Sequence, residues 1–187
     1  MEPVSDSVYQ PLNTEKREIR LLRLHGLRPG DDSVIKCSIQ HAVLYVNPPE
    51  YSAISYMWGD PGETKTLEIS GTEVAIPKNA WEVLEAMCWR QELIWIDSVC
   101  INQNHIKERN HQVALMGDIY SSAERVYVWL GRGTERSLQV MDAIRQDGPH
   151  RLRTDGIKKL SRLGLIEIYD NAYWNRLWIV QEIVLGK

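Results

Sequence analysis

Short apolar runs that stop abruptly at polar or turn-forming residues predict the strands of this chain. The most informative run is Leu93–Ile96 (LIWI), which is apolar on both alternating faces, as in a strand covered on both sides, and is followed at once by Asp97. Tyr51–Gly59 (YSAISYMWG) and Arg125–Leu130 (RVYVWL) have the same apolar character. We therefore expect all three to be core strands of one sheet.

Four further segments predict antiparallel strands. Ile19–Leu24 and Ser33–Val46 carry β-branched and apolar residues and are separated by turn-forming residues, so we expect them to pair. Thr66–Ile69 and Thr72–Ile76 alternate between apolar and polar residues on either side of a Ser-Gly turn. This pattern predicts a β-hairpin.

Helices are predicted where apolar residues recur every three or four positions. Asn79, with Glu82 three residues later, forms a capping-box pattern and predicts a helix to about Trp89 that crosses over between two core strands. The same periodicity predicts helices over His105–Ala123, Ser137–Ile144 and Asp170–Leu185.

The last of these helices is expected to begin with Asp170 as its N-cap and to turn Trp174 and Trp178 inward. The chain stops at Lys187, close to the end of this helix, as expected of a fragment of a longer protein. Upstream, Arg145–Lys159 is charged and interrupted by glycine and proline, so we interpret it as a solvated insertion rather than a basic binding patch.

Alternation of strands and helices predicts an α/β fold with a mostly parallel sheet and an added β-hairpin. We expect residues 1–18 to form a polar N-terminal arm and residues 19–187 to form one domain.

Composition excludes several classes of partner. The net charge of −3 argues against nucleic acid and anionic membranes, which require a concentrated positive field. No apolar run approaches the roughly 20 residues of a membrane span, and the first ten residues lack the features of a secretory signal. The three cysteines have unrelated spacings, which favours a reducing cytoplasm and predicts neither a disulfide framework nor a metal site.

Polar groups follow two of the core strands where each strand is expected to end. Ser55, Trp58 and Gly59 lie at the exit of one strand and Asp97 at the exit of another, the position where open α/β sheets bind ligands. Ser55 and Gly59 would let a phosphate or ribose approach the backbone, and Trp58 offers a stacking face. Asp97 would either orient a polar group of a ligand or cap the next turn by binding backbone N–H groups there. We expect Cys100 to begin the loop beyond it, which runs to Gln103.

Four motifs occur in order along nearly the whole chain, namely YSAISYMWGD, LIWIDSVCINQ, HQVALMGDIYSSAERVYVWLG and YWNRLWIVQE. Together they closely resemble the heterokaryon-incompatibility (HET) domain of filamentous fungi. This resemblance implies a cytoplasmic module of nonself recognition and regulated cell death, which would act with an allelic or other nonself-recognition partner protein.

A more distant resemblance connects AISY, WID and WIVQEI to motifs of Toll/interleukin-1 receptor (TIR) domains. It implies a TIR-like, flavodoxin-like layered fold and a site that cleaves NAD+ as a substrate, with no separate cofactor. In that comparison Glu182 matches the catalytic glutamate and Trp178 the aromatic residue that precedes it. Met57 and Trp58 stand where catalytic animal-type TIR domains tend to carry basic residues, and the closing strands of a TIR sheet have no counterpart after Gly186.

Glu182 is the sharpest candidate for chemistry. Cleavage of the nicotinamide–ribose bond builds positive charge on the ribose, which one carboxylate near the anomeric carbon can stabilise because nicotinamide leaves readily. The alternative is a solvent-facing helix glutamate that offsets a Lys or Arg. Arg109 would pair with a pyrophosphate, or with Glu108 or another helix neighbour. Cys100 is expected to be a buried inert thiol rather than a nucleophile activated by His105 or His111.

Two functions follow from these expectations. The first is an NAD+ glycohydrolase that becomes active when copies of the domain associate, since constant NAD+ consumption would poison the host. The alternative is a non-enzymatic signalling module that triggers cell death by homotypic assembly. Both imply self-association, and the role of Glu182 distinguishes them.

Overall fold

The computed structural model describes residues 8–28, 30–147, 159–176, 179 and 182. It divides into two compact units, one made of residues 1–129 with 178–187 and the other of residues 130–177, and each is described here by itself. The expected division into an arm of residues 1–18 and a domain of residues 19–187 stays a prediction.

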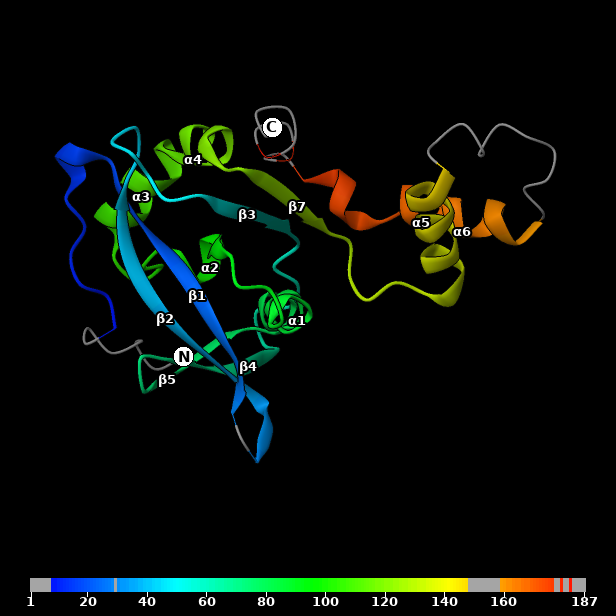
Figure 1. Cartoon of the computed structure of the whole chain (residues 1–187), viewed down its shortest axis with the longest axis horizontal. Coiled ribbons are helices and arrows are strands. Elements are labelled where there is room, and N and C mark those ends of the chain that lie inside the picture. Colours follow the sequence, from blue (N-terminus) through cyan, green and yellow to red (C-terminus); the bar gives the residue numbers. More distant parts are fainter. Residues whose placement is uncertain (1–7, 29, 148–158, 177–178, 180–181, 183–187) are drawn as a thin grey trace. The chain divides into compact units, whose positions relative to one another are not determined.

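The described residues of the larger unit form one seven-stranded sheet with the order β5-β4-β2-β1-β6-β3-β7 (Figure 1). The strands are β1 (Glu18–Arg28), β2 (Asp31–Val43), β3 (Tyr51–Tyr56), β4 (Thr64–Ile69), β5 (Thr72–Pro77), β6 (Leu93–Trp95) and β7 (Arg125–Trp129). β3 runs parallel to β6 and β7, and β2 runs parallel to β4. The pairs β1–β2, β1–β6 and β4–β5 are antiparallel. The α/β class is therefore confirmed, with a mixed sheet.

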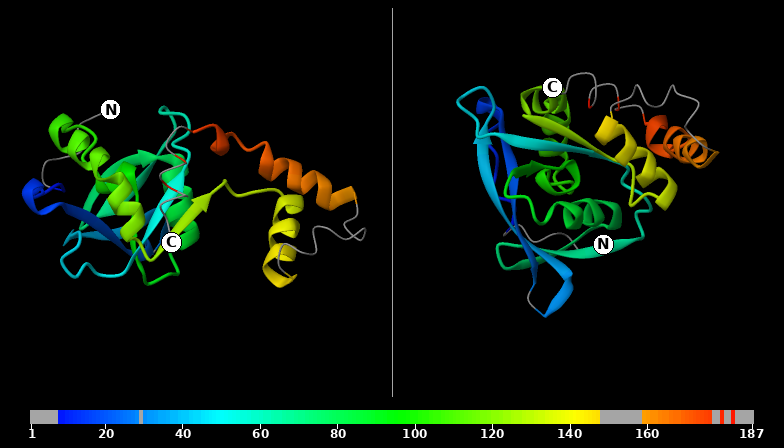
Figure 2. Two further views of the ribbon diagram at one scale, coloured as in Figure 1. Left: turned by 90° about the horizontal axis from the view of Figure 1, so that it is seen from above. Right: turned by 45° about the vertical axis from the view of Figure 1, so that its right-hand side comes forward.

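All predicted strands are present. β1 and β2 form the expected antiparallel pair, whose far end projects beyond β4 in two views (Figures 1 and 2), and β4 and β5 form the expected hairpin. β3 is enclosed along its whole length, since all six of its residues are buried, as are the three residues of β6. Its apolar composition on both faces is thus explained by cover on both sides.

The larger unit also contains the 3-10 helix η1 (Thr14–Lys16) and the α-helices α1 (Lys78–Met87), α2 (Asp97–Cys100), α3 (Ile106–Ala114) and α4 (Met116–Ser122). α1 packs against β1, β2, β4 and β5. α4 is fastened to β3 because the Tyr51 hydroxyl donates to Ile119 O at 2.5 Å and the Tyr120 hydroxyl donates to Ile54 O at 3.0 Å. Tyr120 also packs edge-on against Trp95 of β6.

The prediction of one long helix over His105–Ala123 was wrong. The helix breaks at Leu115, whose N–H bonds back to Gln112 O at 3.0 Å and whose burial, with that of Met116, starts a new apolar face. Within α3 the sequence pattern was misleading, because Ile106 is 63% exposed while Glu108 and Gln112 are buried. Tertiary hydrogen bonds to these two polar side chains outweigh the apolar periodicity.

Two local expectations next to the core strands were also wrong. Cys100 does not begin a loop, because it is the last residue of the short helix α2. Asn79 does not cap α1, since the helix begins at Lys78 after Pro77, and the Asn79 side chain donates to Met57 O at 3.0 Å instead. A backbone acceptor beyond β3 therefore replaces the expected capping-box partner.

The smaller unit contains α5 (Glu135–Asp147), α6 (Lys159–Tyr169) and the 3-10 helix η3 (Ala172–Asn175). α5 confirms the helix predicted over Ser137–Ile144, and α6 was not predicted. The helix predicted from Asp170 was wrong at its start, because Asn171 caps η3 and Arg176 is extended. Trp174 is consequently 41% exposed, and the neighbouring Tyr173 is buried in its place.

Residues 148–158, which make up most of the predicted solvated insertion, lie outside the described residues. In the described part of this unit, α5 and α6 pack side by side. Gly164 of α6 permits the contact, because a Cβ atom at this position would lie 2.5 Å from Arg136 O and 2.8 Å from Val140 Cγ2. Neither contact can be relieved by swinging a long side chain away.

Gly164→Ala should therefore destabilise the α5–α6 pair by about 1–3 kcal/mol, the usual cost of overpacking. Urea unfolding followed by hydrogen exchange of the α5 and α6 amides measures this loss in the smaller unit alone. Gly62→Ala is the matched control, since its Cβ would approach only the Asp60 carboxylate, at 3.3 Å. Equal stability of the two variants would contradict the close packing at Gly164.

Candidate functional site

The parallel register of three strands brings their carboxyl ends to one edge of the sheet. β3 pairs with β6 through Ala53 and Trp95, and with β7 through Ser55 and Val128. Residues that follow these strands must therefore emerge close together. The sequence prediction that the exits of β3 and β6 share an edge is confirmed.

Ser55 and Glu182 form a buried pair at this edge. The Ser55 hydroxyl donates a hydrogen bond to Glu182 Oε2, joining residues 127 positions apart in the sequence. Both residues are 0% exposed. The alternative of a solvent-facing Glu182 that offsets a basic residue is therefore wrong. Dielectric screening is weaker inside a protein than in water, so a buried carboxylate interacts more strongly with a nearby charge and can stabilise a cation.

Trp58 and Asp97 form a second pair at the same edge. The indole Nε1 of Trp58 donates to Asp97 Oδ2 at 2.8 Å, and Asp97 Oδ1 accepts from the backbone N–H of Ser98 at 2.7 Å. The Asp97 carboxylate thus binds a backbone N–H, as expected for a structural role, and also orients the Trp58 ring. Trp58 is 42% exposed, so part of its ring is accessible to a ligand.

Gly59 closes the turn after β3 in a conformation that favours glycine. Its φ is +78°, and a Cβ atom would lie 2.7 Å from Nδ2 of Asn79. That same Asn79 amide holds Met57 O. A side chain at position 59 would thus disturb the contact that sets the direction of the chain between Ser55 and Trp58.

Two further candidates are Arg109 and Trp178. Arg109 is exposed on α3, and its neighbour Glu108 pairs with Arg20, so the alternative of a Glu108–Arg109 pair was wrong. Trp178 lies outside the described residues.

Sequence reasoning missed Arg20 and Glu108. Arg20 of β1 is 0% exposed, and its two terminal nitrogens donate to the two carboxylate oxygens of Glu108 at 2.5 and 3.1 Å. A partial signal was available, because Arg20 and Arg23 both interrupt the apolar run of the predicted strand Ile19–Leu24, although only Arg20 is buried. A basic residue in such a run needs a buried partner, which the sequence could not identify.

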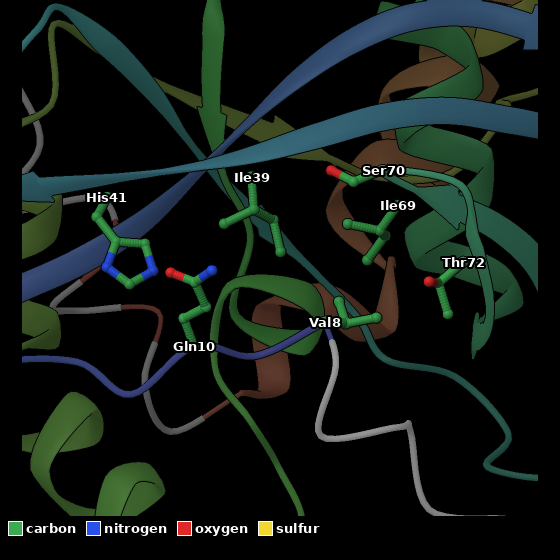
Figure 3. A pocket seen from close by; sticks show the side chains of 7 residues that line it. All are labelled: Val8, Gln10, Ile39, His41, Ile69, Ser70 and Thr72. Atoms are coloured by element: carbon green, nitrogen blue, oxygen red, sulfur yellow. The ribbon is translucent and has the colours of Figure 1, made fainter.

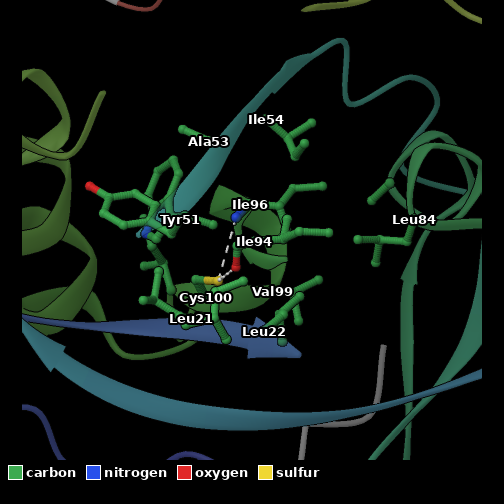
Figure 4. Close-up of a cluster of buried hydrophobic side chains, with 14 of the residues drawn as sticks. Leu21, Leu22, Tyr51, Ala53, Ile54, Leu84, Ile94, Ile96, Val99 and Cys100 are labelled. Carbon is green, nitrogen blue, oxygen red and sulfur yellow. Dashed lines mark hydrogen bonds between the residues drawn. The ribbon is translucent and has the colours of Figure 1, made fainter. Parts of the chain in front are cut away.

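Cys100 is an inert thiol in this structure. Its sulfur accepts from the Ile96 N–H at 3.4 Å and lies 3.9 Å from Ile94 O, inside the apolar cluster of Figure 4. Burial raises the pKa of the Cys100 thiol to about 12. His105 is exposed and caps α3 through its ring nitrogen. The nucleophilic alternative therefore has no support.

A pocket of about 200 Å³ lies away from this edge, between the N-terminal segment, β2 and the β4–β5 turn (Figure 3). Its lining residues are Val8, Gln10, Ile39, His41, Ile69, Ser70 and Thr72. None of them is a predicted site residue. Within the described ranges, no group of three or more His, Cys, Asp or Glu residues could hold a metal ion. No helix in that part of the chain is long and apolar enough to cross a membrane.

Comparison with known proteins adds an independent line of evidence. Residues 51–182 match the family model described as heterokaryon incompatibility protein (HET). The heterokaryon incompatibility protein 6, OR allele, of Neurospora crassa is 37% identical over 152 residues, which cover 73% of this chain and 22% of that protein. This chain thus spans less than a quarter of the relative. No solved structure matches it, so the resemblance to TIR domains stays a prediction.

The cysteines provide a test of the described core. Burial raises the pKa of Cys37 and Cys100, whereas Cys88 is partly exposed and its pKa is raised less. At pH 8.5 iodoacetamide should modify Cys88 in the folded protein, and Cys37 and Cys100 only after denaturation, because the reactive species is the accessible thiolate. Peptide mass spectrometry measures the order.

The same shifts predict a pH dependence of stability. The unfolded chain releases these thiol protons near pH 8.5, while the folded chain retains them to higher pH. The contribution of the buried thiols to stability is thus complete below pH 8.5 and declines above it.

In the labelling experiment, rapid modification of Cys100 in the folded protein would contradict the buried position of α2.

Proposed function

Because the chain belongs to the heterokaryon-incompatibility (HET) family, we propose that it is a cell-death effector domain of fungal nonself recognition that hydrolyses NAD+ when copies assemble. NAD+ is the substrate in this proposal, self-association activates the domain, and an allelic or other nonself-recognition protein triggers it in the cytoplasm. The proposal includes a TIR-like, flavodoxin-like ancestry for the sheet.

The observation that carries the proposal is the buried Ser55–Glu182 pair at the carboxyl edge of the parallel strands. In the proposed reaction the bond between the ribose anomeric carbon and the nicotinamide nitrogen breaks, and its electron pair stays on nicotinamide. Water adds to the anomeric carbon and releases one proton. Glu182 would stabilise the positive ribose between these events, and Ser55 would orient its carboxylate.

The neighbouring groups have chemistry that suits the rest of the substrate. Asp97 offers a carboxylate for ribose hydroxyls, and the partly exposed ring of Trp58 offers a stacking face. The positive φ of Gly59 leaves the backbone open to close approach. Arg109 and Trp178 complete the proposed substrate contacts, Arg109 as a partner for the pyrophosphate.

Burial of Glu182 also supports dependence on assembly. In the single chain its carboxylate is 0% exposed and accepts the Ser55 hydroxyl. A ribose can reach this carboxylate only after the buried pair is uncovered. Association between copies would provide the free energy for that change, which keeps the isolated domain nearly silent.

The same burial supports a second candidate function. A hydroxyl–carboxylate bond deep in a protein can serve the fold alone, since a buried polar group must be hydrogen-bonded wherever it occurs. In that case the domain would signal by homotypic assembly without catalysis, and Glu182 would be structural.

NAD+ consumption by deliberately clustered protein tests the proposal. We expect clustered wild type, fused to a ligand-inducible oligomerisation module, to release nicotinamide, and Glu182→Gln to lose at least about 100-fold of this activity. Glutamine keeps an acceptor for Ser55, so a thermal melt should show that the variant folds. Glu124→Gln, at an exposed position of the same unit, is the matched control and should retain full activity.

Cell death separates the two functions. Killing that disappears in Glu182→Gln but persists in Glu124→Gln supports the enzyme. Absence of NAD+ loss from clustered wild type, together with undiminished killing by Glu182→Gln, would overturn the enzyme and favour the assembly module.

A further inference from the structure

The guanidinium of Arg20 connects β1 to three other segments of the chain. Besides Glu108 of α3, it donates to Cys100 O of α2 at 3.2 Å and to Gln10 O of the N-terminal segment at 2.6 Å. The Tyr9 ring lies over the guanidinium at 4.9 Å. Four hydrogen bonds and one cation–π contact thus converge on one fully buried charge in β1.

Residues of this cluster also hold α2 and Asn102, which follows it by two positions. The Tyr9 hydroxyl donates to Val99 O at 2.9 Å, next to the Cys100 carbonyl that Arg20 binds. Glu108 Oε1 accepts the backbone N–H of Asn102 at 2.8 Å. Carbonyl groups at a helix C-terminus have no partner within the helix, and a cation there is favourable.

Such external support matters because α2 is only four residues long. One helical turn is not stable by its own hydrogen bonds, since fixing its dihedral angles costs more than one bond returns. Burial of Val99 and Cys100 attaches α2 to the core. Tyr9 and Arg20 bind the carbonyl groups of Val99 and Cys100 and so restrict the direction of its axis.

Asp97, the first residue of α2, makes this direction relevant to the candidate site. Its carboxylate binds Trp58 at one end of the short helix, while Tyr9 and Arg20 bind the carbonyl groups at the other end. Gln103 Nε2 also donates to Asp97 O at 2.9 Å. A tilt of α2 would therefore move the Asp97 carboxylate relative to Trp58.

We propose that Arg20 and Glu108 are positioning residues for Asp97, and that Tyr9 and Gln10 make the position of Asp97 depend on docking of the N-terminal segment. The consequence for substrate rests on the proposed function, in which Asp97 binds ribose hydroxyls. The positioning itself is a property of the unliganded chain and can be measured without NAD+.

The indole N–H resonance of Trp58 reports the Trp58–Asp97 hydrogen bond in the full chain. It is identified among the seven tryptophans by its loss in Trp58→Phe. Tyr9→Phe removes one hydroxyl and keeps the ring over Arg20. We expect it to shift or broaden the Trp58 resonance and to reduce hydrogen-exchange protection of residues 98–103 by about three- to tenfold, as expected for loss of one hydrogen bond.

Glu108→Gln should have the same effects more strongly, because it leaves Arg20 without its countercharge. Tyr45→Phe is the matched control, the same chemical change at a residue that is 59% exposed. The Trp89 resonance is an internal reference, since its N–H is bound to Ala86 O. If Glu108→Gln does not fold, the Trp58 resonance and the exchange protection in Tyr9→Phe still test the proposal.

An unchanged Trp58 resonance with unchanged protection in folded Tyr9→Phe would overturn the proposal, as would equal changes in Tyr45→Phe.

Enzyme activity provides a separate test of the consequence for substrate. In clustered protein, Tyr9→Phe should raise the KM for NAD+ by about three- to tenfold with little change in kcat. Failure of clustered wild type to consume NAD+ overturns the proposed function, and the Trp58 resonance then still decides the positioning.

Discussion

Burial of β3 on both faces is the constraint on which the rest of the structure depends. A strand whose six residues are all enclosed must have partners along both edges and cover on both sides. β6 and β7 provide the edges in parallel register, and α4 is fastened to the strand by the hydroxyls of Tyr51 and Tyr120. The parallel direction then gathers the residues that follow these strands. The position of the candidate site thus follows from the parallel pairing of β3 with β6 and β7.

Buried polar side chains define a second level of organisation. Arg20, Glu108 and Glu182 are buried charged residues of the larger unit, and each is hydrogen-bonded to a residue at least 88 positions away in the sequence. Such groups are costly to bury without a partner. Each pair consequently restricts the relative positions of two distant segments more strictly than apolar packing does. The Ser55–Glu182 pair restricts the segments that meet at the sheet edge, and the Arg20–Glu108 pair restricts the segments next to α2.

The range matched by the family model includes the candidate site. The family match covers residues 51–182, which begins at the first residue of β3 and ends at Glu182, the partner of Ser55. β1 and β2 precede the matched range, yet Arg20 of β1 supports α2 inside it. The larger unit therefore depends on strands that the family model does not include.

The sequence by itself determined the strands, because short apolar runs such as LIWI that end at polar or turn-forming residues are typical of strands covered on both sides. It also determined the shared edge of Ser55, Trp58 and Asp97, since parallel strands end together. Tertiary structure alone decided that Glu182 reaches Ser55 and that Arg20 pairs with Glu108. It also decided that the predicted long helix breaks at Leu115. The reason is physical: periodicity reports which residues prefer burial, whereas the partner of a buried charge is set by distances between segments that no local pattern encodes.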